Sequence, residues 1–256
     1  MTGEGWTLRL RRSGAGQFLV KVSQQTGVPG AVVLVVLSVG LVVAFAGFGF
    51  AVALEDVMEG DGVVGVDPSV QRFFVQHRTS GLNEVFRVIT RLGSAGVILV
   101  LALGVILFLV WRQERVLALG LVLATGGTAI LVALVKLLVD RSRPPPIDRL
   151  SGATGASFPS GHSAEAIAFY GAIAWIVVVL VRGRRLRMLA CAGALGLGLL
   201  VGFSRAYLGV HWASDVVSGW LLGLAWLAAT IGVCALVPTM LETSRAARDQ
   251  SEPRAE

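Results

Sequence analysis

The chain has 256 residues, of which 55% are hydrophobic and only 15% are charged. Soluble globular domains carry about 25% charged residues, so this composition excludes a disordered chain and disfavours an ordinary water-soluble fold. The formal net charge is +6, but most arginines lie at the ends of apolar segments and do not interleave with aromatic residues, so nucleic-acid binding is not expected.

Six apolar blocks contain few or no charged residues. A transmembrane helix needs about 20 mostly apolar residues, which matches the length of these blocks. The blocks lack the alternation of polar and apolar residues that is typical of membrane β-barrels. The sequence therefore predicts an all-α polytopic membrane helix bundle with six transmembrane helices, embedded in a lipid bilayer. The blocks are 31–54, 95–111, 116–139, 164–181, 188–204 and 213–237.

The two ends of the chain are polar. A signal peptide is an alternative for the first block, since Ala44-Phe45-Ala46 resembles a cleavage site, but the apolar run continues beyond the length of a signal peptide and favours a retained span. We expect a cytoplasmic N-terminal segment at 1–28, a six-span domain at 29–240 and a solvated cytoplasmic tail at 241–256.

The distribution of charge predicts the orientation. Cytoplasmic loops of membrane proteins are rich in Lys and Arg. The densest basic run is 182–187, whereas acidic residues gather just after the first block. With six spans, this pattern places both termini in the cytoplasm and the segment 55–94 outside a plasma (inner) membrane.

The outer segment carries two apolar stripes at helical spacing. Asp67-Pro68 predicts a helix start, with Asp67 as the N-cap. Two short amphipathic helices on the outer leaflet account for the stripes, and so does packing on the bundle; a gate for lipid entry is a hypothesis. The stripes are Val70, Phe73, Phe74 and His77, and then Leu82, Val85, Phe86 and Ile89.

Three polar clusters interrupt the apolar pattern. The first runs from Lys136 to Pro144, the second is Pro159–His162, and the third runs from Ser204 to Asp215. In the predicted topology all three reach the outer face. Polar groups near a bilayer are costly and usually functional, so we expect the clusters to form one site.

The chemistry of the clusters suits phosphate. Lys136, Arg143 and Arg205 lack enough matching acids, and arginine binds phosphate oxygens with two parallel hydrogen bonds. Ser160 and Gly161 precede an apolar block, where the N–H groups of a helix N-terminus favour an anion. These five residues predict a phosphate-binding cradle.

Two histidines supply candidate catalytic groups. His211 and Asp215 are four residues apart and share one face of a helix that begins near His211. A carboxylate that accepts one imidazole N–H leaves the other nitrogen free to act as a nucleophile. His162 begins the fourth span and is a candidate general acid.

Other polar residues have less specific expectations. His77 has no charged cluster around it and is expected at the surface. Glu165 lies one turn after His162, where it either tunes that histidine or forms a hydrogen bond within the bundle. The segment 151–157 reads as a loop that covers the site. We expect ion pairs at the rim of the site among Asp140, Arg141, Asp148 and Arg149.

Together the clusters resemble the type 2 phosphatidic acid phosphatase superfamily of integral-membrane lipid phosphate phosphatases. Its signature is Lys-x6-Arg-Pro, Pro-Ser-Gly-His and Ser-Arg-x5-His-x3-Asp, and no signature position is missing. The matching residues are Lys136, Arg143, Pro144, Pro159, Ser160, Gly161, His162, Ser204, Arg205, His211 and Asp215.

The resemblance implies a mechanism. His211 would form a phosphohistidine, Asp215 would orient it, and His162 would protonate the leaving alcohol and then activate water. No metal and no cofactor are implied, because cations stabilise the charge of the phosphoryl group. The implied phosphate ligands are Lys136, Arg143, Ser160, Gly161, His162 and Arg205.

The resemblance also implies a substrate class, a membrane lipid with a phosphate monoester or a pyrophosphate. Polyprenyl pyrophosphate, phosphatidate and phosphatidylglycerol phosphate are candidates, and an outward site suits the first. A lipid-linked phosphotransferase that uses the same phosphohistidine is an alternative. A transporter is disfavoured because the polar groups lie at one end of clean spans. No feature of the sequence specifies an oligomeric state.

Overall fold

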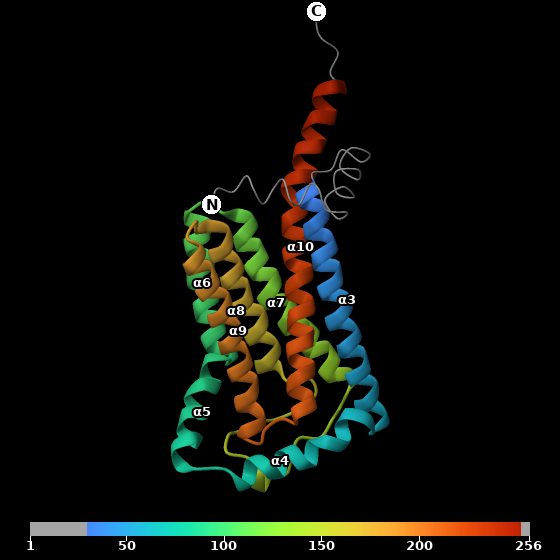
Figure 1. Cartoon of the computed structure of the whole chain (residues 1–256), viewed down its shortest axis with the longest axis vertical. Helices are drawn as coiled ribbons and strands as arrows, with labels where there is room; N and C mark the ends of the chain where they lie inside the picture. Colours follow the sequence, from blue (N-terminus) through green and yellow to red (C-terminus); the bar gives the residue numbers. More distant parts are fainter. Residues whose placement is uncertain (1–29, 252–256) are drawn as a thin grey trace, which may run out of the picture. The chain divides into compact units, whose positions relative to one another are not determined.

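Helices make up all of the regular secondary structure in residues 30–251, the part of the chain whose backbone the computed structural model describes; side chains are described for 32–236 (Figure 1). The predicted all-α class is confirmed for these residues. The predicted segment 1–28 and the last residues of the chain lie outside them. In chain order the elements are α3 (Gly30–Glu59), η1 (Gly62–Val66), α4 (Asp67–Gln76), α5 (Ser80–Leu92), α6 (Ala95–Trp111), α7 (Arg115–Leu138), η2 (Pro146–Asp148), α8 (Gly161–Leu180), α9 (Arg184–Tyr207) and α10 (Ala213–Ser251).

The chain divides into two compact units. Val42–Thr230 form one unit, which contains all three polar clusters. Met1–Leu41 and Ile231–Glu256 form the other. Within the described part of this second unit, Gly232 allows α10 to approach α3, because a Cβ atom at this position would lie 2.9 Å from Cγ1 of Val39.

Five helices of the described chain are long and apolar enough to cross a membrane, namely α3, α7, α8, α9 and the first 24 residues of α10. The predicted second block, 95–111, coincides with α6, which has 17 residues. By itself α6 is shorter than the other spans, and it qualifies together with α5, from which it is bent by 45°. Six spans are therefore present if this bent pair crosses as one. The protein is a multi-pass membrane protein.

The bend between α5 and α6 occurs at Gly93. A Cβ atom here would clash with Cγ1 of Val201 in α9 and would lie 3.5 Å from Cδ2 of His162 in α8. Glycine therefore lets the bent pair pack closely on both helices. Composition alone could not predict this bend, since it depends on neighbours more than 60 residues away.

Two helix ends extend beyond the apolar blocks. The fourth block begins at residue 164, and α8 begins at Gly161 with Ser160 as its N-cap, in agreement with the helix N-terminus expected at these residues. The sixth block ends at residue 237, and the backbone of α10 remains helical to Ser251, within the segment expected as a tail. The apolar run ends near residue 237. The Arg, Ala, Glu and Gln residues that follow have high intrinsic helix propensity, so the helix continues.

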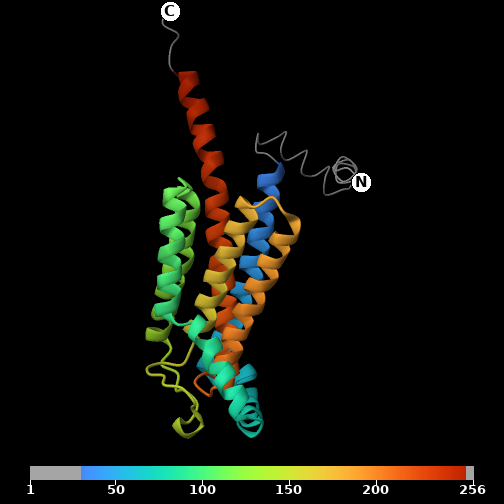
Figure 2. The same ribbon diagram turned by 90° about the vertical axis from the view of Figure 1, so that its left-hand side faces the viewer.

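The outer segment forms the two predicted helices, and both pack on the end of α9. The ring centroid of Phe74 in α4 lies 5.2 Å from that of Phe203, and the ring centroid of Phe86 in α5 lies 4.4 Å from that of Tyr207. Both figures show α4 and α5 at the end of the bundle where α9 leads into α10 (Figure 2). Phe74 and Phe86 of the two stripes therefore pack on the bundle, whereas Phe73, Leu82 and Val85 are exposed.

Small residues bring the start of α10 against the start of α8. A Cβ atom at Gly219 would lie 2.5 Å from the carbonyl oxygen of Ser160, and one at Gly223 would lie 3.1 Å from Cα of Ala164. Glycines four residues apart are a common device for close packing of membrane helices. Here they place the second polar cluster against the third.

Candidate active site

The three polar clusters of the sequence meet in one place. The backbone N–H of Ser157 donates to the carbonyl oxygen of Arg141 at 2.8 Å, and that of Ser160 donates to the carbonyl oxygen of Asp215 at 3.0 Å. The guanidinium of Arg143 donates to the carbonyl oxygen of Val210 at 2.7 Å. Segments from the end of α7, the start of α8 and the turn between α9 and α10 are thus linked directly.

His211 is buried and has a defined tautomer. Its Nδ1 lies 3.4 Å from Oδ2 of Asp215, and its Nε2 lies 3.0 Å from Nη1 of Arg143. Arginine only donates, so Nε2 must accept with a lone pair, and the ring proton must lie on Nδ1, where Asp215 accepts it. The geometry therefore leaves Nε2 unprotonated and facing a cation.

Burial keeps His211 neutral. It lowers the pKa of His211 from 6.5 to about 4, although the hydrogen bond and the charge of Asp215 act in the opposite direction. A neutral imidazole at physiological pH has the lone pair that nucleophilic attack requires.

Asp215 is fully buried and accepts hydrogen bonds from several directions. Oδ1 accepts from Arg141 at 2.6 Å, and Oδ2 accepts from the backbone N–H of Trp212 at 2.9 Å and from the hydroxyl of Ser157. These donors fix the orientation of the carboxylate that faces His211. A buried charge is tolerated when it is paired and hydrogen-bonded in this way.

Lys136 and Arg143 bind the same loop. Nζ of Lys136 donates to the carbonyl oxygens of Ala156 at 2.5 Å and Ser157 at 3.3 Å. Arg143 donates to the carbonyl oxygens of Gly155 at 2.9 Å and of Thr154 and Ala156 at 3.1 Å each. The segment predicted as a covering loop is therefore fixed beside the two cations.

Arg205 is buried and only partly satisfied. Its Nη1 donates to Oγ1 of Thr90 in α5 at 2.9 Å, whereas its Nε has no hydrogen-bond partner among the described residues. An unpaired buried donor is costly, and a bound anion would satisfy it. Thr90 was not singled out in the sequence, since nothing local distinguishes it from other threonines.

The start of α8 presents an open helix N-terminus. Ser160 caps the helix by accepting from the backbone N–H of Ser163 at 3.4 Å. The N–H groups of Gly161 and His162, in the first turn, have no intrahelical acceptor. A Cβ atom at Gly161 would meet only Cγ1 of Val132, at an ordinary contact distance of 3.4 Å, so protein packing does not require glycine here. Glycine, which has no Cβ atom, would let an anion approach the backbone N–H groups closely.

His162 lies among the charged groups of the other clusters. It is within electrostatic range of Arg205, His211, Arg143 and Lys136. All eight predicted site residues therefore gather in one region.

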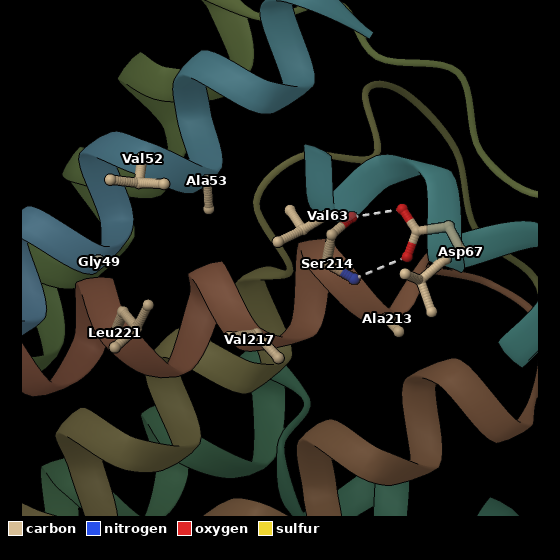
Figure 3. Close-up of a pocket in the computed structure, with 10 residues that line it drawn as sticks. Gly49, Val52, Ala53, Val63, Asp67, Ala213, Ser214, Val217 and Leu221 are labelled. Atoms are coloured by element: carbon tan, nitrogen blue, oxygen red, sulfur yellow. Dashed lines mark hydrogen bonds between the residues drawn. The ribbon is translucent and has the colours of Figure 1, made fainter. Parts of the chain in front are cut away.

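A network around Asp67 was missed in the sequence. Its Oδ1 accepts from the backbone N–H of Ser214 at 2.9 Å, and its Oδ2 accepts from the Ser214 hydroxyl at 2.5 Å (Figure 3). Oδ2 also accepts from Nη2 of Arg141 at 2.7 Å. The predicted N-cap role of Asp67 is wrong, because Val66 is the N-cap and Asp67 is the first residue of α4.

Arg141 also differs from its prediction. It was expected in an ion pair at the rim, yet it pairs with two buried carboxylates, Asp67 and Asp215. Both partners are 74 residues away in the chain, so local charge spacing could not reveal them.

Comparison with known proteins decides the family. A model of the PAP2 superfamily matches residues 115–235. The chain is 31% identical over 180 residues to phosphatidylglycerophosphatase B of Bacillus subtilis. The alignment covers 69% of this chain and 87% of that protein. The chain belongs to the PAP2 superfamily. The resemblance seen in the sequence is thereby confirmed.

Further relatives are consistent with PAP2 membership. The chain is 31% identical over 126 residues to an undecaprenyl-diphosphatase of Sulfolobus acidocaldarius, covering 47% of this chain and 56% of that protein. The crystal structure of a transmembrane PAP2-type phosphatidylglycerolphosphate phosphatase from Bacillus subtilis superposes with a TM-score of 0.69 at 29% identity, covering 75% of this chain and 94% of that one. LpxE of Aquifex aeolicus shares the fold, with a TM-score of 0.53, 24% identity, and coverage of 65% of this chain and 94% of that one.

The PAP2 match covers all three polar clusters but not the outer segment. Asp67 and Thr90, which contact the clusters, lie before its first residue. These contacts are therefore features of this chain that the family signature does not describe.

A cavity of about 320 Å³ lies beside Asp67 and Ser214 (Figure 3). No PAP2 signature residue is among its lining residues, and its polar side chains, Asp67 and Ser214, are already hydrogen-bonded to each other. It therefore offers no phosphate-binding group. Its lining residues are Gly49, Val52, Ala53, Val63, Val66, Asp67, Ala213, Ser214, Val217 and Leu221.

Two remaining expectations concern single residues and metal binding. His77 is exposed, as predicted, and its ring stacks on Phe73 with centroids 4.2 Å apart. Among the side chains at 32–236, no three His, Cys, Asp or Glu residues lie together in positions suited to hold a metal ion.

Proposed function

We propose that this protein is a membrane lipid phosphatase that works through a phosphohistidine on His211 without a metal. The observation that carries the proposal is the pair of contacts on the His211 ring. Asp215 lies at Nδ1, and Arg143 lies 3.0 Å from an unprotonated Nε2, where the phosphate of a substrate would bind.

The first step transfers the phosphoryl group to the enzyme. Substrate phosphate oxygens take over donors of Arg143, Lys136 and Arg205, and Nε2 of His211 attacks phosphorus. The N–P bond forms as the bond from phosphorus to the lipid oxygen breaks, and His162 donates a proton to the leaving oxygen. The cations stabilise the charge on the equatorial oxygens, and Asp215 stabilises the cationic ring.

The second step returns the enzyme to its starting state. His162, now neutral, takes a proton from a water molecule that attacks phosphorus. The O–P bond forms, the N–P bond to His211 breaks, and inorganic phosphate leaves. Each histidine ends with the protons it had at the start.

The substrate class follows from the membrane setting and from the relatives. The candidates are phosphatidylglycerol phosphate, polyprenyl pyrophosphate and phosphatidate. We place phosphatidylglycerol phosphate first, because the relative that aligns over 87% of its own length is a phosphatidylglycerophosphatase. The relative named for a polyprenyl diphosphate aligns over 56% of its length.

The proposed orientation places the site at the outer face of the plasma membrane, with both termini in the cytoplasm. It is supported by the basic run at 182–187, which lies between α8 and α9 at the opposite end of these helices from the polar clusters. The proposed domain organisation remains a six-span phosphatase domain over 29–240.

Purified protein tests the proposal with a panel of the three lipids, scored by release of inorganic phosphate. We expect turnover of at least one lipid and a loss of about 1,000-fold or more in His211→Ala, as for other nucleophile deletions. Brief reaction with a lipid substrate that carries a radiolabelled phosphate group should leave an acid-labile, alkali-stable label on the wild-type protein and no label on His211→Ala. Appearance of label in a lipid or sugar acceptor in place of free phosphate would instead identify a phosphotransferase.

A further inference from the structure

The carboxylate of Asp215 is held on two sides by different groups. Oδ2 faces His211, whereas Oδ1 accepts from Nη1 of Arg141 at 2.6 Å. The other terminal nitrogen of Arg141 donates to Asp67 at 2.7 Å. One guanidinium therefore bridges two carboxylates, and the side chain of Arg141 is itself only 11% exposed.

Asp67 is built into this arrangement. Its side chain is 3% exposed, and it accepts both the backbone N–H and the hydroxyl of Ser214, the residue directly before Asp215. The Ser214 hydroxyl also lies 2.7 Å from Nη1 of Arg141. Four side chains thus form one buried hydrogen-bonded network behind the His211–Asp215 pair.

The charges explain why two carboxylates are present. A single Arg141 paired only with Asp215 would neutralise the negative charge that a cationic His211 ring needs. A second carboxylate on the same guanidinium shares its charge, so that Arg141, Asp67 and Asp215 carry a net charge of about −1 beside the ring. The network therefore keeps Asp215 oriented without cancelling its charge.

We propose that Asp67 and Arg141 are positioning residues for the nucleophile, acting on His211 through Asp215. This inference rests on the proposed function. Neither residue contacts the region of Nε2 where a phosphate would lie, so both should affect the chemical step and leave substrate binding unchanged. Asp67 also begins α4, so the outer segment is linked to Asp215 through Arg141.

The test measures kcat and KM for Asp67→Asn in the membrane-embedded full chain. The amide keeps the shape of the side chain but removes its charge, so we expect kcat to fall about tenfold or more with KM unchanged, within the range for residues in one network. Arg141→Lys keeps the charge but cannot bridge both carboxylates, and the same split is expected. If Asp67→Asn does not accumulate in the membrane, Arg141→Lys alone tests the inference.

A matched control is Glu84→Gln, which breaks an exposed Arg–carboxylate pair on the same outer segment. It should retain wild-type kcat and KM. The double variant Asp67→Asn/Arg141→Lys should lose little more than either single variant, because both changes interrupt one path. Fully multiplicative losses, or a rise in KM at constant kcat, would overturn the inference.

His211→Ala separates this inference from the proposed function. If His211→Ala is inactive while Asp67→Asn and Arg141→Lys turn over at the wild-type rate, the positioning role is wrong and the nucleophile assignment stands. If His211→Ala retains activity, the proposed mechanism itself is wrong.

Discussion

At the scale of single residues, the two contacts of the His211 ring decide its chemistry. A donor on one nitrogen and an acceptor on the other select one tautomer out of two. Asp215 supplies the acceptor from the first turn of α10, whereas His211 lies two residues before that helix begins, so the expected single helix does not contain both residues. Arg143 supplies the donor from a segment 68 residues away.

The pH dependence of His211 follows from its burial. With a folded-state pKa of about 4 against 6.5 for an exposed imidazole, the ring stays neutral down to about pH 5. As the pH falls, the imidazole of His211 takes up a proton in the unfolded chain before it does so in the folded protein. The contribution of His211 to the free energy of unfolding is therefore full above pH 6.5 and is lost as the pH falls toward 4.

Nuclear magnetic resonance of protein with ¹⁵N-labelled histidine checks this prediction. The chain has three histidines, so the His211 signal is assigned by its loss in His211→Ala. We expect a neutral Nδ1–H tautomer whose titration midpoint lies near pH 4. A midpoint near pH 6.5, the ordinary value of an imidazole, would contradict it.

The signature residues could be predicted from the sequence, whereas their supporting partners could not. The four-residue spacing of His211 and Asp215 does bring the two side chains together, although only Asp215 lies in α10. Arg141 stands among other charged residues, which suggested a local ion pair, yet its partners come from α4 and α10. Such pairings depend on how helices pack, and no local pattern carries that information.

At the scale of elements, the outer segment does more than cover the bundle. Its two helices contact the third polar cluster through Phe74 and Phe86 and also supply Thr90 to Arg205. Hydrophobic periodicity predicted that α4 and α5 exist, since it reports which face is apolar. It did not predict the bend at Gly93, because the bend reflects close approach to α8 and α9.

Thr90→Val tests the contribution of α5 to phosphate binding. The change preserves the shape of the side chain but removes the acceptor of Arg205, so this guanidinium should be held less firmly. We expect the inhibition constant of inorganic phosphate to rise about three- to tenfold, the value of one hydrogen bond.

The matched control for Thr90→Val is Thr125→Val in α7, where the hydroxyl donates only to carbonyl oxygens of its own helix. This variant should bind phosphate as the wild type does. Equal weakening in both variants would show that α5 does not act through Arg205.

At the scale of the whole molecule, the site concentrates positive charge at one end of the bundle. Lys136, Arg143 and Arg205 come from three segments, and Asp215 supplies the carboxylate beside the His211 ring. In the proposed mechanism these cations would supply the charge stabilisation that a divalent metal provides elsewhere.

Metal removal tests this replacement. We expect full activity after treatment with EDTA and competitive inhibition by vanadate, which resembles a phosphoryl group in transfer. Loss of activity in EDTA that added Mg²⁺ or Zn²⁺ restores would show that a metal takes part, and the proposed mechanism would be wrong on that point.

The orientation of the bundle is the last prediction. Exposed positions offer one site near each end, Ile147 beside the polar clusters and Arg184 at the start of α9. In a chain with Cys191→Ser and Cys234→Ala, a membrane-impermeant maleimide on intact cells should label Ile147→Cys and should label Arg184→Cys only after permeabilisation. The physical reason is that positively charged loops stay on the cytoplasmic side, so the run at 182–187 is expected there, and in the six-span topology an even number of spans separates it from both termini. Labelling of both positions in intact cells would exclude the six-span topology, and the reverse pattern would put the phosphate-binding end in the cytoplasm.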